Sequence, residues 1–144
     1  MLKPTKISDI KRNWYLIDAK DQILGRLTTQ VVTDLMGKNK PYFVRHLDCG
    51  DYVVVTNAKD IRVTGKKETQ KKYYRYSGYP GGLYTRTLAE QRIKDPTKII
   101  YEAVKGMLPQ NKLRDRMLTR LFVFADDKHP YQDKFNAINS AKVE

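Results

Sequence analysis

The order of apolar residues between positions 14 and 55 constrains the fold more than any other feature. Residues 14–19 form a compact run of aromatic and branched side chains, which is typical of a buried strand. Between residues 24 and 36 apolar side chains recur at every third or fourth position, and Gly37 follows as a helix cap. Residues 52–55 are apolar at consecutive positions, as in a strand covered on both faces. The sequence therefore predicts a strand, a helix and a parallel strand joined by a right-handed crossover.

The rest of the chain continues this alternation of strands and helices. Residues 61–64 are a candidate for a third short strand. Thr87 and Glu90 have the spacing of a capping box, and Pro96 restarts a second helix that carries an apolar face. A last short helix precedes a final buried strand at residues 121–125. We therefore expect an α/β layer fold around a largely parallel sheet.

The charge balance indicates the class of partner. The chain carries 28 Lys and Arg against 16 Asp and Glu, which gives a net charge of +12 and a pI near 9.8. A surface this basic attracts polyanions, so nucleic acid is the first candidate partner and an anionic membrane is the second. The membrane is the weaker choice because no apolar run approaches the roughly 20 residues of a spanning helix.

Length and patterning favour a single domain. At 144 residues, of which 40% are hydrophobic, the chain can bury a core without disulfides or metals. We expect a basic N-terminal arm at residues 1–12 and a polar, extended C-terminal tail at residues 126–144. The N-terminus lacks the apolar stretch of a signal peptide, and the single cysteine, Cys49, fits a reducing compartment. We expect a soluble protein that is not exported.

Residues 66–82 are built unlike a core segment. Five cations stand against one acid, Glu68, in the first ten residues, and tyrosines and glycines follow. Phosphate neutralisation and stacking on aromatic rings act together in RNA binding, so this mixture favours contact with nucleic acid. A solvated hairpin is the alternative interpretation. The stretch from Gly78 to Gly82 is a turn, and its glycines would also let the backbone approach a phosphate.

A second basic group lies near the C-terminus, at Lys112, Arg114, Arg116 and Arg120. Each of these side chains could simply solubilise its helix. As a group beside a loop that binds a polyanion, they would form a second patch for phosphate contacts. The sequence therefore predicts an RNA surface in two parts.

Residues suited to catalysis are sparse. Gly25 lies between a strand and a helix, where a dinucleotide fold holds pyrophosphate, but the GxGxxG spacing is missing. The chain has only two histidines, and neither has a nucleophile beside it. Two small clusters could suggest a metal, thiol or acid-base site, yet they are better interpreted as loops: His46, Asp48, Cys49 and Asp51, and Asp126, Asp127 and His129. We expect no metal, no cofactor and no small-molecule substrate.

Several ordered motifs together resemble the uL13 family of large-subunit ribosomal proteins, in its bacterial form. The resemblance runs over nearly the whole chain. Its markers are the stretches at residues 14–19, 24–27, 50–55, 57–58, 63–67, 73–75, 78–82 and 105–109. The sequence departs from the family pattern at Tyr76, where histidine is frequent, at residues 113–116, where Leu-Gly-Arg is common, and at residues 129–132.

The resemblance implies a three-layer α/β/α fold with a central, mainly parallel four-stranded sheet. It also implies a protein without catalytic activity that binds 23S-type ribosomal RNA and supports early assembly of the large subunit in the cytoplasm. Its other partners would be neighbouring large-subunit ribosomal proteins. The alternative from another class is an enzyme with a Rossmann-like nucleotide pocket, and a third interpretation is a general polyanion binder. A nucleotide-binding enzyme would be stabilised by mononucleotides. A general polyanion binder would not distinguish structured RNA from any duplex of equal charge.

Combining the basic patches, the tyrosines and the resemblance gives one set of residues that we expect at the RNA. They are Lys38, Lys40, Arg45, Lys66, Lys67, Lys71, Lys72, Tyr73, Tyr74, Arg75, Tyr76, Tyr79, Gly81, Gly82, Arg86, Lys112, Arg114, Arg116 and Arg120. The lysines before Tyr73 would contact phosphates without regard to sequence, and residues 76–82 would recognise RNA shape.

Overall fold

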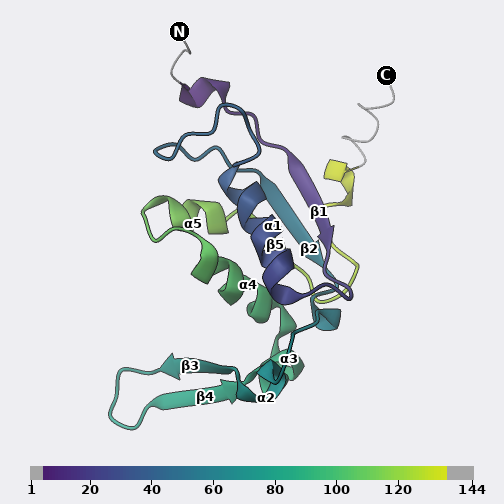
Figure 1. The fold of residues 1–144 in the computed structure, drawn as a ribbon, viewed down its shortest axis with the longest axis vertical. Coiled ribbons are helices and arrows are strands. Elements are labelled where there is room, and N and C mark those ends of the chain that lie inside the picture. Colours follow the sequence, from purple (N-terminus) through teal and green to yellow (C-terminus); the bar gives the residue numbers. More distant parts are fainter. Residues whose placement is uncertain (1–4, 136–144) are drawn as a thin grey trace.

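Three parallel strands form the central sheet of the computed structural model, which describes residues 5–135. Their order is β1 (Trp14–Asp18), β2 (Tyr52–Thr56) and β5 (Leu121–Val123), so β2 is central (Figure 1). Trp14 lies opposite Tyr52, and Val53 lies opposite Leu121. The predicted parallel strand pair is confirmed, and the buried run Val53 to Val55 is fully covered, as its consecutive apolar residues indicated.

The helices α1 (Leu24–Met36) and α4 (Pro96–Met107) pack against each other on one face of this sheet. Both crossovers, from β1 to β2 and from β2 to β5, step in the same direction across the sheet. Right-handed connections that step in one direction place their helices on the same face. Alternate strand residues, among them Ile17 and Val55, point to that face and join the core cluster with Leu27 and Val104.

Aromatic rings cover part of the opposite face. Trp14 stacks on Tyr52 with ring centroids 4.4 Å apart, and Tyr131 lies 4.5 Å from Phe122. Phe135 meets Trp14 edge to face. The prediction of an extended tail from residue 126 onward is therefore wrong for the described part of the tail, because residues 131–135 fold back onto the sheet. Residues 136–144 lie outside the described residues.

Two details of the predicted sheet change. The strand at residues 14–18 is not fully buried, because β1 lies at the edge of the sheet and leaves half of Leu16 exposed. At residues 61–64, where a further strand was expected, the described chain forms only a single parallel bridge between Ile23 and Arg62. The short 3-10 turn η2 (Ala58–Asp60) separates this segment from β2. The described residues therefore contain a central sheet of three strands, rather than four.

The helix ends follow their sequence signals. Gly37 closes α1 in the left-handed conformation, with φ of +74°. Thr87 and Glu90 form the predicted capping box at the start of α3 (Leu88–Lys94), and Pro96 is the first residue of α4. The short helix α5 (Leu113–Leu118) then leads into β5, and η1 (Ile7–Asp9) precedes β1.

A two-stranded antiparallel hairpin projects from this body. It consists of β3 (Lys72–Tyr76) and β4 (Leu83–Thr87) and follows the single-turn helix α2 (Lys67–Gln70). Figure 1 shows the hairpin extending away from the sheet, with α2 and α3 at its base. Residues 66–82, predicted as a binding segment or a solvated hairpin, thus contribute α2, β3 and the turn to a projecting ribbon.

Candidate nucleic-acid interface

The register of the hairpin sorts its side chains onto two different faces. Tyr73 lies opposite Arg86 and Arg75 lies opposite Tyr84, so one face carries two arginines. The other face carries uncharged residues apart from Lys72, because Tyr74 lies opposite Thr85 and Tyr76 lies opposite Leu83. The ribbon therefore carries two tyrosines on each face, and its faces differ in charge, since one is cationic and the other is mostly neutral.

Both faces are open to solvent. Tyr74, Tyr76 and Tyr84 are each about two thirds exposed, and Leu83 is 58% exposed. A two-stranded ribbon without a core beneath it is marginally stable in water, so large exposed rings on it indicate a surface that a partner covers. No acidic residue lies between Glu68 and Glu90 in the sequence. Charge complementarity thus favours an anionic partner.

The cations of this region are unpaired within residues 5–135. Apart from Lys71, which is half-buried, they are exposed, and they make no ion pair with a described acid: Lys66, Lys67, Lys71, Lys72, Arg75 and Arg86. Lys71 lies over the ring of Tyr73 with its Nζ 5.5 Å from the centroid. Because these charges are not neutralised inside the protein, they remain available for phosphates.

The tip of the hairpin is held by its own backbone. The amide of Ser77 donates to the carbonyl of Gly82, and the amide of Gly82 donates to the carbonyl of Tyr79. Gly81 has φ of +73°, in the left-handed region that favours glycine. At Gly82 a Cβ would collide with the Ser77 Oγ, so the turn also leaves no room for a side chain there. The turn exposes Tyr79, which is 76% exposed.

Arg92 on α3 fixes the base of the hairpin. Its Nε donates to Glu68 Oε1 at 3.0 Å, and its Nη1 donates to the carbonyls of Lys59 and Ile61, both at 2.8 Å. One side chain thus links α2, which leads into the hairpin, to the segment after β2. Tyr73 is half-buried beside it, and burial, reinforced by the nearby Glu102, raises the pKa of its phenol.

The second predicted group lies at the other end of α4. Lys112 and Arg116 are exposed at α5, Arg114 is half-buried, and Lys38 and Arg45 are exposed in the loop at residues 37–51. Figure 1 shows the hairpin and α5 at opposite ends of α4, a helix of 12 residues. At 1.5 Å per residue, α4 is about 18 Å long. The structure thus keeps the two predicted patches apart, with α4 between them.

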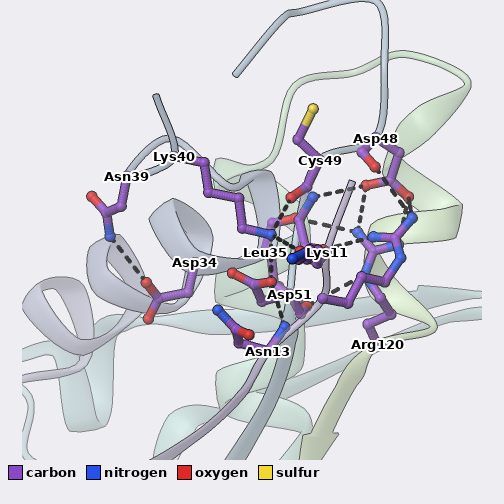
Figure 2. A network of polar contacts seen from close by, with 12 residues as sticks. Lys11, Asn13, Asp34, Leu35, Asn39, Lys40, Asp48, Cys49, Asp51 and Arg120 are labelled. Carbon is purple, nitrogen blue, oxygen red and sulfur yellow. Dashed lines mark hydrogen bonds and ion pairs between the residues drawn. The ribbon is translucent and has the colours of Figure 1, made fainter. Parts of the chain in front are cut away.

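Two residues that were predicted to contact RNA, Lys40 and Arg120, instead have their cationic groups paired with acids inside the protein. Figure 2 shows Lys40 pointing into the loop at residues 37–51, where its Nζ lies 2.6 Å from Asp51 Oδ1 and 2.8 Å from the carbonyl of Cys49. Arg120 is only 6% exposed, and its guanidinium forms a bidentate ion pair with Asp48. These cations hold the loop against the end of α1, so their charges are already paired within the protein, and RNA contact by Lys40 and Arg120 stays a prediction.

The acids of this network were visible in the sequence, but their partners were not. The cluster at His46, Asp48, Cys49 and Asp51 is a loop before β2, as expected, and the described residues contain no group of acids, histidines and cysteines suited to a metal. Asp126, from the other small cluster, pairs with Lys59 at 2.6 Å. Arg92 was missed altogether, since nothing in its local sequence distinguishes it from a solvated helix residue.

The order of the strands also bears on the alternative prediction of a Rossmann-like nucleotide pocket. In open α/β sheets, ligands bind where successive crossovers diverge to opposite faces. Here both crossovers run to one face, so the described sheet lacks such a switch point. No helix among residues 5–135 is both long enough and apolar enough to cross a membrane.

Comparison with known proteins gives consistent matches along the chain. The model of the family described as "Ribosomal protein L13" matches residues 12–130. A protein of Oleidesulfovibrio alaskensis named "Large ribosomal subunit protein uL13" is 53% identical over 127 residues, which cover 88% of each chain. Proteins with the same name from Thermobifida fusca and Cupriavidus taiwanensis are 52% and 48% identical, over 88% of this chain and 85% and 89% of theirs.

Proposed function

The chain belongs to the ribosomal protein L13 family, and from that premise we propose that it is a structural component of the large ribosomal subunit that binds 23S-type ribosomal RNA. The family consists of ribosomal proteins and is not known for enzymatic activity. The protein would act in translation, on cytoplasmic ribosomes, among neighbouring large-subunit proteins. Binding early, it would support assembly of the subunit.

The exposed, unpaired cations of the hairpin support this proposal most strongly. Arg75 and Arg86 lie on one face of a ribbon that has no acid of its own, and Lys66, Lys67 and Lys72 extend the positive charge at its base. Such a surface neutralises phosphates, which is the main source of affinity in protein-RNA complexes. Tyr84 shares the face of the two arginines, whereas Tyr74 and Tyr76 would meet the RNA from the opposite face of the ribbon.

The cluster at α5 adds a second contact. This cluster, which consists of Lys112, Arg114 and Arg116 with Lys38 and Arg45 from the neighbouring loop, would bind phosphates at the other end of α4 from the hairpin. A folded RNA can present phosphates at both places at once, whereas a mononucleotide cannot. Two separated clusters therefore favour a large, structured RNA as the partner.

Co-sedimentation tests the proposal. The chain, mixed with large subunits that lack this protein, should pellet with them and stay bound after a high-salt wash that removes loosely associated proteins. In competition, a structured 23S RNA domain should displace it at far lower concentration than a plain RNA duplex of equal charge. Loss in the wash, or equal displacement by the duplex, would reduce the protein to a general polyanion binder.

A further inference from the structure

A cavity of about 650 Å³ lies in the angle between the base of the hairpin and the core. Three parts of the chain line it: the start of α1, residues 63–71 and the C-terminal half of α4. Much of its wall is apolar, from Ile23, Val63, Ala103 and Met107. Met107, in the last turn of α4, borders this cavity and is 49% exposed.

Two helical glycines border the same cavity from different helices. Gly25 lies in the first turn of α1 and Gly106 in the last turn of α4, and both are exposed. A Cβ on either glycine would have no atom within 4 Å beyond its own helix, and neither glycine has a positive φ. Glycine in a helix costs stability relative to alanine, and here neither packing nor backbone conformation requires it. Close approach of a ligand to both backbones would account for the two glycines.

The polar groups around the cavity indicate the kind of ligand. Lys67 and Lys71 border one side and carry no ion pair within the described residues. Gln70 and Glu102 also line the cavity, and their oxygens accept hydrogen bonds. A bare phosphate would suit the lysines but not Glu102. A nucleotide suits the whole set, because its base fits apolar walls, its amino and hydroxyl groups donate, and its phosphate is anionic.

We propose that this cavity receives one unpaired nucleotide of the bound RNA, with its base between Gly25 and Gly106 and its phosphate at Lys67 and Lys71. The inference rests on the proposed function. The cavity adjoins the base of the hairpin, and the half of α4 that lines it leads into α5. An RNA strand that contacts both basic clusters would therefore pass over it.

Filling the cavity tests this proposal without disturbing the fold. In Gly25→Leu and Gly106→Leu the new side chain enters open space, so the melting temperature should stay the same or rise. Affinity for a 23S RNA domain should nevertheless fall by roughly tenfold, which corresponds to about 1.4 kcal/mol of lost binding free energy, because the base could no longer enter. Gln30→Leu is the matched control, because Gln30 is exposed on α1 and lies outside the cavity. It should bind like the unchanged protein.

Chemical probing of the RNA supplies an independent readout. The unchanged protein and Gln30→Leu should protect one unpaired nucleotide that both cavity variants leave reactive. Unchanged RNA affinity and protection in both leucine variants would overturn the inference while leaving RNA binding intact. Failure of the unchanged protein to bind the RNA domain would instead overturn the proposed function. A different result would be that a free nucleoside monophosphate raises the melting temperature of the unchanged protein but not that of the leucine variants. That result would assign the cavity to a free nucleotide and overturn its assignment to RNA.

Discussion

The cations of the hairpin and those around the loop at residues 37–51 are chemically alike but stand in opposite surroundings. On the hairpin, Arg75 and Arg86 are exposed on a ribbon without acids. In the loop region, Lys40 and Arg120 are buried against Asp51 and Asp48. The first group can gain free energy only from an outside anion, whereas the second has already gained it by folding. The presence of acids nearby, and not the density of basic residues, therefore separates the structural cations from those that we propose bind RNA.

Removing Arg120 should have the largest effect on stability. In Arg120→Ala the carboxylate of Asp48 remains in a mostly buried site without its main partner, and the carbonyls of Leu35 and Asp51 lose donors. Breaking a buried ion pair in this way costs about 3–5 kcal/mol. Urea denaturation measures the loss. Arg116→Ala, one turn earlier and exposed, should stay within about 0.5 kcal/mol. If the two variants have equal free energies of unfolding, the claim that the buried cation stabilises the fold more than the exposed one is wrong.

Replacing Arg92 should have an intermediate effect, because Arg92 joins the base of the hairpin to the segment after β2. Arg92→Ala removes the ion pair with Glu68 and two hydrogen bonds to backbone carbonyls, at a cost of about 1–3 kcal/mol. RNA affinity should also fall, because the hairpin would no longer be held at a fixed angle to the core. The salt dependence of binding should not change, since the hairpin keeps its cations. If affinity is unaffected, Arg92 has no positioning role.

The smallest effect is expected at Asp34, beside the structural network. Burial, reinforced by the charge of Asp51, raises the pKa of this carboxyl. An acid with a raised folded-state pKa destabilises the fold once pH exceeds its ordinary value, because folding then opposes its ionisation. Asp34→Asn should therefore increase the free energy of unfolding at pH 7. Denaturation at several pH values should show the gain shrinking as pH falls toward 4, and a gain independent of pH would exclude this cause.

Local sequence signals predicted the local structure well. The capping box at Thr87, the cap at Gly37 and the first strand-helix-strand unit are all confirmed. Each depends on residues close together in the chain. The mixed α/β fold with a mainly parallel sheet is confirmed for the same reason.

Features that depend on distant residues could not be predicted in this way. Arg120 and Asp48 are 72 positions apart, so the ion pair that buries this arginine has no local signature. The edge position of β1 and the single helical face depend on strand order, which periodicity does not encode. For the same reason Lys38 and Lys40 look alike in sequence, although only Lys40 reaches Asp51.

The salt dependence of RNA binding tests the central claim most directly. Combined replacement of Lys66, Lys67, Lys71 and Lys72 by alanine should leave the melting temperature nearly unchanged, because none of them pairs with a described acid. Affinity for a 23S RNA domain should fall, and the slope of log K against log salt should flatten by about 0.7 to 0.9 for each phosphate that the protein no longer neutralises. An unchanged slope with unchanged affinity would contradict the account, since the unpaired cations would then not be the ones that bind RNA.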